Sequence, residues 1–308
     1  WTVDEFRPYV VHRFADGSKD WLFDGFLFLE FKDGSGRNYT VGYEKLNARR
    51  TEWEWLLDRI FEQGKSLSAL DRCIGEEIGE LGKPVFRHRI VLGLPEAIRG
   101  QKDWGEIDGR EMDFSKEEDQ IAATKWYIGE LVERFKAAKY KHLELSGFYW
   151  VAEDTHHCEE LTIPLSEYIH SEGKLFYWIP YWQAKGHEEW KRLGFDVAYQ
   201  QPNHFFNHSI PDSRLDEACA TARRHGMAME FEFDEKATAA IPNSSHDRMA
   251  AYINHFEKND VFNSSAVAYY CGNRGVLTLD ESDNPKDKAL MDRLARIIQA
   301  RRYLKYGI

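Results

Sequence analysis

The sequence predicts one α/β domain: a single (β/α)8 TIM barrel spanning residues 1–308, in which the first two strands are joined without a helix. Short apolar segments of strand character alternate with amphipathic helical segments, which is the pattern of a mostly parallel sheet. The strand segments number eight, the number that closes such a barrel. No linker, low-complexity tract or shift in composition divides the chain, so we expect a single domain.

Each predicted strand is a short run rich in β-branched and aromatic residues. The eight runs are residues 7–13, 24–31, 84–94, 142–150, 175–182, 196–202, 227–233 and 265–272. Only the segment FADGSKDW joins the first two runs, which leaves no room for a helix there.

The predicted helices lie between the later strands and show the 3.6-residue period of apolar positions. Two fill residues 48–81, and another begins after Ser115 as N-cap, with Glu118 at the capping-box position. The remaining helices are predicted at 187–194, 213–226, 245–260 and 284–302.

Composition excludes several classes of protein. With 41 Lys and Arg against 52 Asp and Glu, the chain carries a net charge of -11. It lacks the basic stripe that a nucleic-acid binder uses to displace counterions. The chain contains no run of about 18 apolar residues, the length that a membrane-spanning helix needs. Because the chain starts at Trp1 without a signal-like segment, we expect that a targeting segment was trimmed away. We expect no cofactor, and the sequence does not predict the oligomeric state.

The cysteines and one polar segment raise the question of a metal. Cys73, Cys158, Cys219 and Cys271 lie far apart and match no zinc-binding spacing, so we expect reduced core residues. The segment HHCEE, residues 156–160, offers five ligand-type side chains in a row. Adjacent loop residues rarely converge on one ion, so we interpret it as a polar loop at the start of a helix and expect no metal.

The segment MAMEFEFDE alternates large apolar and acidic residues with the period of a strand. In a barrel, the apolar set must face the surrounding helices, and the acids then point inward. The apolar set is Met227, Met229, Phe231 and Phe233. We expect Glu230 to lie deep and to form a structural ion pair with Arg87, Arg89 or Arg7, because a buried charge needs a partner. Glu232 and Asp234 are expected at the solvent-facing rim.

A second acid is expected at the same rim. Glu153 and Asp154 follow Trp150 at the end of the fourth predicted strand, whereas Glu232 ends the seventh. By strand count this resembles the large clan of retaining glycosidases on this fold, whose acid/base and nucleophile follow strands four and seven. The clan's usual Asn-Glu pair is absent, since Ala152 precedes Glu153.

Aromatic and amide side chains gather after the predicted strands in a way that suits a sugar ring. A pyranose offers apolar C–H faces for stacking and hydroxyls for hydrogen bonds. The candidate substrate-binding residues are Trp150, Tyr181, Trp182, Gln200, Asn203 and Asp234. Long loops follow the third strand (residues 93–114) and the seventh (residues 235–246), and we expect them to wall a groove.

Three segments carry a resemblance to a known family: GFYWVAED, FYWIPYWQAKGHEEWKRLGFDVAYQQPNHFF and MAMEFEFDE. Across nearly the whole chain the sequence resembles a bacterial domain-of-unknown-function family, number 4855, found among Bacteroidetes polysaccharide-degradation proteins. The resemblance implies a glycosidase-like TIM barrel, a glycan ligand, and secretion to the periplasm or cell surface. It supplies no reaction.

Two functions are compatible with these features. In a glycoside hydrolase, one carboxylic acid protonates the leaving oxygen and a second carboxylate acts as nucleophile or base. Glu153 and Glu232 are the candidate catalytic pair. In the alternative, a non-catalytic glycan-binding TIM barrel, the aromatic residues stack on sugar and the acids only accept hydrogen bonds. Sugar identity, linkage, stereochemical course and endo or exo action do not follow from the sequence.

Overall fold

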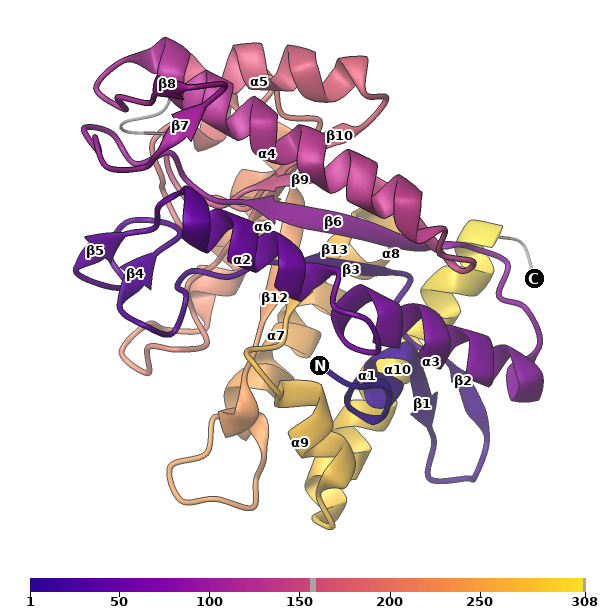
Figure 1. The fold of residues 1–308 in the computed structure, drawn as a ribbon. Coiled ribbons are helices and arrows are strands. Elements are labelled where there is room, and N and C mark those ends of the chain that lie inside the picture. The colour runs from indigo at the N-terminus through magenta and orange to yellow at the C-terminus, as the bar shows by residue number, and fades with distance from the viewer. Residues whose placement is uncertain (156–158, 307–308) are drawn as a thin grey trace. The chain divides into compact units, whose positions relative to one another are not determined.

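The computed structural model describes residues 1–155 and 159–306 and shows a mixed α/β protein (Figure 1). The chain divides into two compact units. The terminal unit contains Trp1–Asp24, Arg72–Arg87 and the residues from Tyr199 onward, and the middle unit contains Gly25–Asp71 and His88–Ala198. The chain therefore passes between the two units several times, and the single-domain interpretation stays a prediction.

Parallel strands form the centre of the middle unit. Their hydrogen-bonded order is β3-β6-β9-β10, and the first residues of β11 pair with β10. These strands are β3 (Gly25–Phe28), β6 (His88–Leu94), β9 (Leu143–Trp150), β10 (Leu175–Trp178) and β11 (Val197–Gln200). The pairs β4 (Arg37–Asn38) with β5 (Leu46–Asn47), and β7 (Glu106–Ile107) with β8 (Arg110–Glu111), form two small separate sheets.

Helices of the middle unit follow its strands in the predicted alternation. They are α2 (Arg50–Ile60), α4 (Glu117–Ala138), α5 (Glu159–Ser171) and the short 3-10 helix η1 (His187–Glu189), while α3 (Ser66–Leu81) continues into the terminal unit. Helices α4 and α5 pack side by side (Figure 1). Only η1 forms where a helix was predicted over 187–194. The predicted cap is also wrong, because Ser115 bonds to Asp113 and α4 begins after Lys116.

The terminal unit contains the end of β11 paired with β12 (Ala228–Glu232), which in turn pairs with β13 (Val267–Tyr270), all parallel. Its helices are α1 (Val3–Val10), α6 (Ser213–His225), η2 (Glu235–Ala237), α7 (His246–Lys258), α8 (Val261–Ser264), α9 (Gly275–Glu281) and α10 (Pro285–Tyr306). A short antiparallel hairpin joins β1 (Val11–Arg13) to β2 (Lys19–Trp21).

The first predicted strand is wrong. Most of residues 7–13 belongs to α1, and only Val11–Arg13 is extended, in the β1-β2 hairpin outside the parallel sheet. The physical reason lies just upstream, where Thr2 and Glu5 form a capping box that starts a helix. Among the described residues, the main parallel sheet therefore has seven strands, with β3 and β13 at the two ends of the order. A complete eight-stranded barrel is not confirmed.

Strand β12 confirms the predicted facing of its apolar side chains. Phe231 is buried against Tyr252 and Phe256 of α7, with ring centroids 4.9 and 5.7 Å away. Met229 and Phe233 are buried as well. Helix α7 thus covers the apolar face of β12.

One glycine is required by close strand packing. A Cβ built on Gly147 of β9 would lie 1.9 Å from the carbonyl oxygen of Leu175 on β10. A register shift between Ile90 and Val91 falls opposite this position, on the other neighbouring strand. Gly147 therefore allows β10 to pair closely with β9 beside an irregularity.

Candidate functional site

Glu232 ends strand β12 of the terminal unit, and two donors hold its carboxylate. Its Oε2 atom accepts hydrogen bonds from the hydroxyl of Tyr252 and, at 3.3 Å, from the backbone N–H of His204. The side chain is 1% exposed, so the expectation that it faces solvent at a rim is wrong. Cover comes from α7 and from the loop that follows β11, neither of which strand periodicity can place. The carboxylate is consequently fixed in one orientation.

Burial also determines the protonation of the groups around Glu232. The pKa of Tyr252 lies well above its usual value of 10, first because the phenol is buried and then because of the Glu232 charge and hydrogen bond. Tyr252 therefore remains a hydrogen-bond donor at neutral pH.

His204 is a neutral imidazole at the base of the same loop. Burial lowers its pKa from 6.5 to about 4, although the Asp212 carboxylate, 2.8 Å from Nε2, opposes the change. The proton of the neutral ring lies on Nε2, where Asp212 accepts it. Within the described part of the chain, Nδ1 is buried and has no hydrogen-bond partner. Arg248 donates to the carbonyl oxygen of His204 and fixes the loop from the other side.

Asp234 and Glu235 follow directly at the end of β12. Asp234 is half-buried, and burial raises its pKa, with the Glu235 charge adding to the effect while the Lys236 N–H, 2.7 Å from Oδ1, opposes it. Glu235 accepts from the backbone N–H of Arg274. Gly272 permits this arrangement, since a Cβ there would lie 2.7 Å from the Asp234 Cβ.

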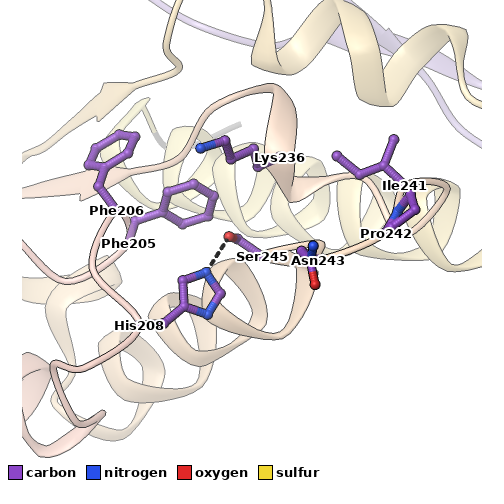
Figure 2. A pocket seen from close by; sticks show the side chains of 8 residues that line it. All are labelled: Phe205, Phe206, His208, Lys236, Ile241, Pro242, Asn243 and Ser245. Atoms are coloured by element: carbon purple, nitrogen blue, oxygen red, sulfur yellow. Dashed lines mark hydrogen bonds between the residues drawn. The ribbon is translucent and has the colours of Figure 1, made fainter.

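A pocket of about 300 Å³ opens in the terminal unit between two loops (Figure 2). The loop after β11 contributes Phe205, Phe206 and His208, and the loop after β12 contributes Lys236, Ile241, Pro242, Asn243 and Ser245. The loop after MAMEFEF was predicted to wall a groove, and it does line this pocket. The other wall of the pocket is the loop after β11, whereas the loop of residues 93–114 was predicted for that place. A hydrogen bond of 3.0 Å between His208 Nε2 and Ser245 Oγ ties the two loops together (Figure 2).

The second loop is held closed by buried hydrogen bonds. The backbone N–H of Ser245 donates to the Lys236 carbonyl at 2.7 Å, which brings the two ends of the loop together. Asp287, at the start of α10, accepts from the Ala239 N–H at 2.7 Å and from the hydroxyl of Thr238. The wall of the pocket is thus anchored to a helix.

The middle unit has an acidic cluster of its own beyond β9. Glu153 is half-buried three residues after the strand ends, and its carbonyl oxygen accepts from the Tyr181 N–H at 3.3 Å. The Tyr181 hydroxyl donates to Asp154 Oδ2 at 3.1 Å. Burial raises the pKa of Tyr181, and the Asp154 and Glu153 charges contribute. The pKa of Tyr43 is raised first by burial and then by the Glu153 charge.

The structure places the other predicted binding residues as follows. Trp150 is 2% exposed and packs edge-on against Phe176 at 6.1 Å, so its indole is part of the core. Trp182 is half-buried, and Asn203, with a left-handed φ of 51°, donates to Gln201 Oε1 at 3.0 Å. Gln200 is completely buried and donates to the Gln201 carbonyl. The roles of these residues in binding stay predictions.

Burial differs between Glu230 and the arginines that were predicted as its ion-pair partners. Glu230 is buried on β12, whereas Arg87 and Arg89 are exposed. Arg89 is the second residue of β6 in the middle unit; burial raises the pKa of Tyr177, and the Arg89 charge opposes this. Arg7 forms ion pairs with Glu76 and Glu77. The pairing of Glu230 with an arginine stays a prediction.

The strand count behind the catalytic pair changes because the first predicted strand is a helix. Among the strands of the seven-stranded sheet in chain order, β9 is the third and β12 the sixth. The resemblance by strand number to the retaining-glycosidase clan is therefore lost. Glu153 and Glu232 nevertheless follow the carboxyl ends of parallel strands in their respective units, and their joint role stays a prediction.

Sequence reasoning missed three residues of these two clusters: Tyr43, Lys236 and Tyr252. Tyr43 lies on a loop far from Glu153 in sequence, and Tyr252 lies within an ordinary amphipathic helix. The segment QQPNHFF, which contains His204, did indicate polar residues after the sixth predicted strand.

Neither a metal-binding cluster nor a membrane-spanning helix occurs among the described residues. Among the described residues, no group of three or more His, Cys, Asp and Glu is placed to hold a metal. His156, His157 and Cys158 of the HHCEE segment lie outside the described residues. Cys73 and Cys219 are buried free thiols and Cys271 is a partly exposed one. Within residues 1–155 and 159–306, no helix has the length and apolar character needed to cross a membrane.

Comparison with known proteins gives distant likenesses. A candidate alpha-L-fucosidase from Bacteroides thetaiotaomicron aligns over 90% of this chain and 93% of its own, at 12% identity and a TM-score of 0.45. An amidohydrolase with bound Zn from Burkholderia ambifaria aligns over 83% of this chain and 69% of its own, at 10% identity and a TM-score of 0.31. At these identities and TM-scores, neither similarity assigns a fold or an activity to this chain. No curated protein matches the chain.

The family comparison is decisive. The model of DUF4855, described as a domain of unknown function, matches residues 1–296, which is nearly the whole chain. The chain therefore belongs to the DUF4855 family.

Proposed function

We propose that this protein is a glycoside hydrolase and that Glu232 is one of its two catalytic carboxyl groups. One observation supports the proposal above the others: Glu232 stands at the carboxyl end of a parallel strand with its Oε2 held by Tyr252 and His204. A carboxylate fixed in this way is preorganised to act as nucleophile or base at an anomeric carbon.

Glu153 is the proposed second carboxyl group, which donates a proton to the leaving oxygen. It follows the carboxyl end of β9 and carries a half-buried side chain. Asp234 is the alternative for this role, because burial raises its pKa and so favours the protonated form that an acid catalyst needs.

The test measures release of reducing ends from a panel of plant, algal and host glycans. We expect activity on at least one glycan, and loss of nearly all of it in both Glu232→Gln and Glu153→Gln. Glutamine keeps an oxygen that can accept from Tyr252 and His204, so the first variant should fold. Glu217→Gln, the same change at an exposed position of α6, serves as the control.

The outcomes separate the candidate roles. Full activity in Glu153→Gln together with loss in Asp234→Asn would transfer the acid role to Asp234. An active Glu232→Gln protein would refute the proposal.

A non-catalytic glycan-binding protein is the second candidate. The exposed rings of Phe206 and Tyr270 favour it, because they could stack on sugar without help from any acid. Glycan binding without release of reducing ends from any member of the panel would support this function. A periplasmic or cell-surface location also stays a proposal, and fractionation of the native cells would test it.

A further inference from the structure

The pocket of the terminal unit differs in charge from the chain as a whole. The chain has a net charge of -11, yet the pocket is lined by Lys236, His208 and neutral side chains, with no Asp or Glu among its lining residues. Its volume of about 300 Å³ lies at the lower end of the range for small-molecule sites. A single sugar unit is a ligand of suitable size.

We propose that this pocket binds a sugar unit that carries an anionic group, either a carboxylate or a sulfate. The inference rests on the proposed glycan ligand and specifies its chemical class. The positive group is Lys236, the apolar surface is Phe206 with Ile241, and Asn243 supplies amide donors and an acceptor.

Lys236 is the group expected to meet the anion. Its ammonium has no carboxylate within ion-pair distance anywhere in residues 1–155 and 159–306, in contrast to the many paired lysines of this chain, such as Lys19 and Lys258. Its backbone is fixed from both sides, by the N–H bond to Asp234 and by the carbonyl bond from Ser245. In Figure 2 the side chain extends toward the two phenylalanine rings at the pocket.

The apolar surface is exposed and held in place. Phe206 is 51% exposed and Ile241 42% exposed, so both offer apolar surface to a ligand. The ring of Phe206 stands edge-on against Tyr270 at 5.8 Å and against Phe205 at 5.2 Å. These contacts restrict the ring while leaving a face for the C–H groups of a sugar.

Together these features distinguish an acidic sugar from a neutral one. A neutral ring would use the phenyl face and Asn243 but would leave the ammonium without a partner. A carboxylate or sulfate would accept a charge-assisted hydrogen bond from it. Because the rest of the chain is acidic, the attraction is local, and short oligosaccharides should bind better than long polyanions.

The experiment is calorimetric binding to matched pairs of probes. Oligogalacturonate is compared with its methyl ester, and sulfated carrageenan oligosaccharide with its desulfated form. We expect at least one anionic probe to bind, with its neutral counterpart about tenfold weaker, the lower limit for a hydrogen bond to a charged group. A difference within the galacturonate pair identifies a carboxylate as the preferred group, and a difference within the carrageenan pair identifies a sulfate.

Variants assign the effect to the pocket. Lys236→Gln should bind the anionic and neutral probes equally, Lys236→Arg should retain the difference, and Phe206→Ala should weaken both. Lys305→Gln, at an exposed position of α10, should behave as the wild type. The advantage of the anionic probe should also shrink as salt is raised.

The inference is overturned if no anionic probe binds, if neutral probes bind as well as anionic ones, or if Lys236→Gln leaves the difference intact. Reducing-end release is measured on the same probes. Binding of an anionic glycan without release would contradict the proposed hydrolase and leave this inference standing. Release of reducing ends from neutral glycans, unchanged in Lys236→Gln, would support the proposed hydrolase and contradict this inference.

Discussion

His204 should make the folded protein sensitive to mild acid. Its folded-state pKa of about 4 lies below the ordinary value of 6.5, so the imidazole gains a proton more readily in the unfolded chain. Above pH 6.5 both states are neutral and the effect is absent. As pH falls toward 4 the unfolded state binds the proton first, and stability is lost through this window.

The size of the loss follows from the two pKa values. The interval from 6.5 to about 4 is about 2.5 pKa units, and each unit corresponds to about 1.4 kcal/mol, giving a limit of about 3 kcal/mol. Between about pH 7 and about pH 5, roughly 2 kcal/mol of this should already be lost. The side chain is completely buried, so solvent screening does not remove the effect.

The assay is urea unfolding of the wild type and His204→Gln at several pH values in that window. Glutamine can still donate to Asp212 but does not titrate, so the variant should lose about 2 kcal/mol less than the wild type on going from about pH 7 to about pH 5. Parallel curves for His204→Gln and the wild type would show that His204 is not held neutral by burial.

Three further predictions concern groups around the same strand ends. Tyr252→Phe removes a hydrogen bond to buried Glu232 and should lower the free energy of unfolding by about 1.5–3 kcal/mol at neutral pH; because the folded-state pKa of Tyr252 is raised above 10, the variant should also lose less stability than the wild type as pH rises past that value, and equal alkaline losses would contradict this. Gly272→Ala should cost about 1–3 kcal/mol more than Gly17→Ala in thermal unfolding, because both glycines have positive φ but only at Gly272 would the Cβ meet Asp234; equal costs would refute the steric argument. At Asp287, burial raises the pKa, but the hydrogen bonds from Ala239, Ser282 and Thr238 outweigh it and lower the pKa below 3.8 overall. Its stabilisation is therefore present above that pH and lost in stronger acid, and Asp287→Asn should lower the free energy of unfolding by about 1.5–3 kcal/mol at neutral pH and loosen the loop of residues 236–245, measured by hydrogen exchange.

Most of the predicted strands agree with the structure. Seven predicted strands match strands of the parallel sheet, because each is a short apolar run with clear turns around it. The first predicted strand was wrong because the apolar residues of α1 fit either a strand or a helix. The capping box of Thr2 and Glu5 favours the helix.

The candidate site could be predicted only in part, because depth is a tertiary property. Alternation places Glu230 and Glu232 on one face of β12, but it does not say what lies over that face. The loop after β11 and Tyr252 of α7 cover Glu232, and both are far away in sequence. Trp150 also lies deeper than expected, since a strand-end tryptophan was expected at the surface and packs inside against Phe176.

The burial of Glu232 changes what a catalytic role would require of this protein. An exposed carboxylate at a rim would be screened by water and free to turn, so its position would contribute little to the reaction. A carboxylate held by a phenol and a backbone N–H has already lost its rotational freedom and its water, and its hydrogen bonds need not reorganise during the reaction. The cost of this arrangement falls on stability, because the charge and the neutral His204 beside it are both kept from solvent. A strand end that only supported the fold could use a leucine at this position at no such cost, so a buried, hydrogen-bonded acid here agrees better with the proposed catalytic role than with a role in stability.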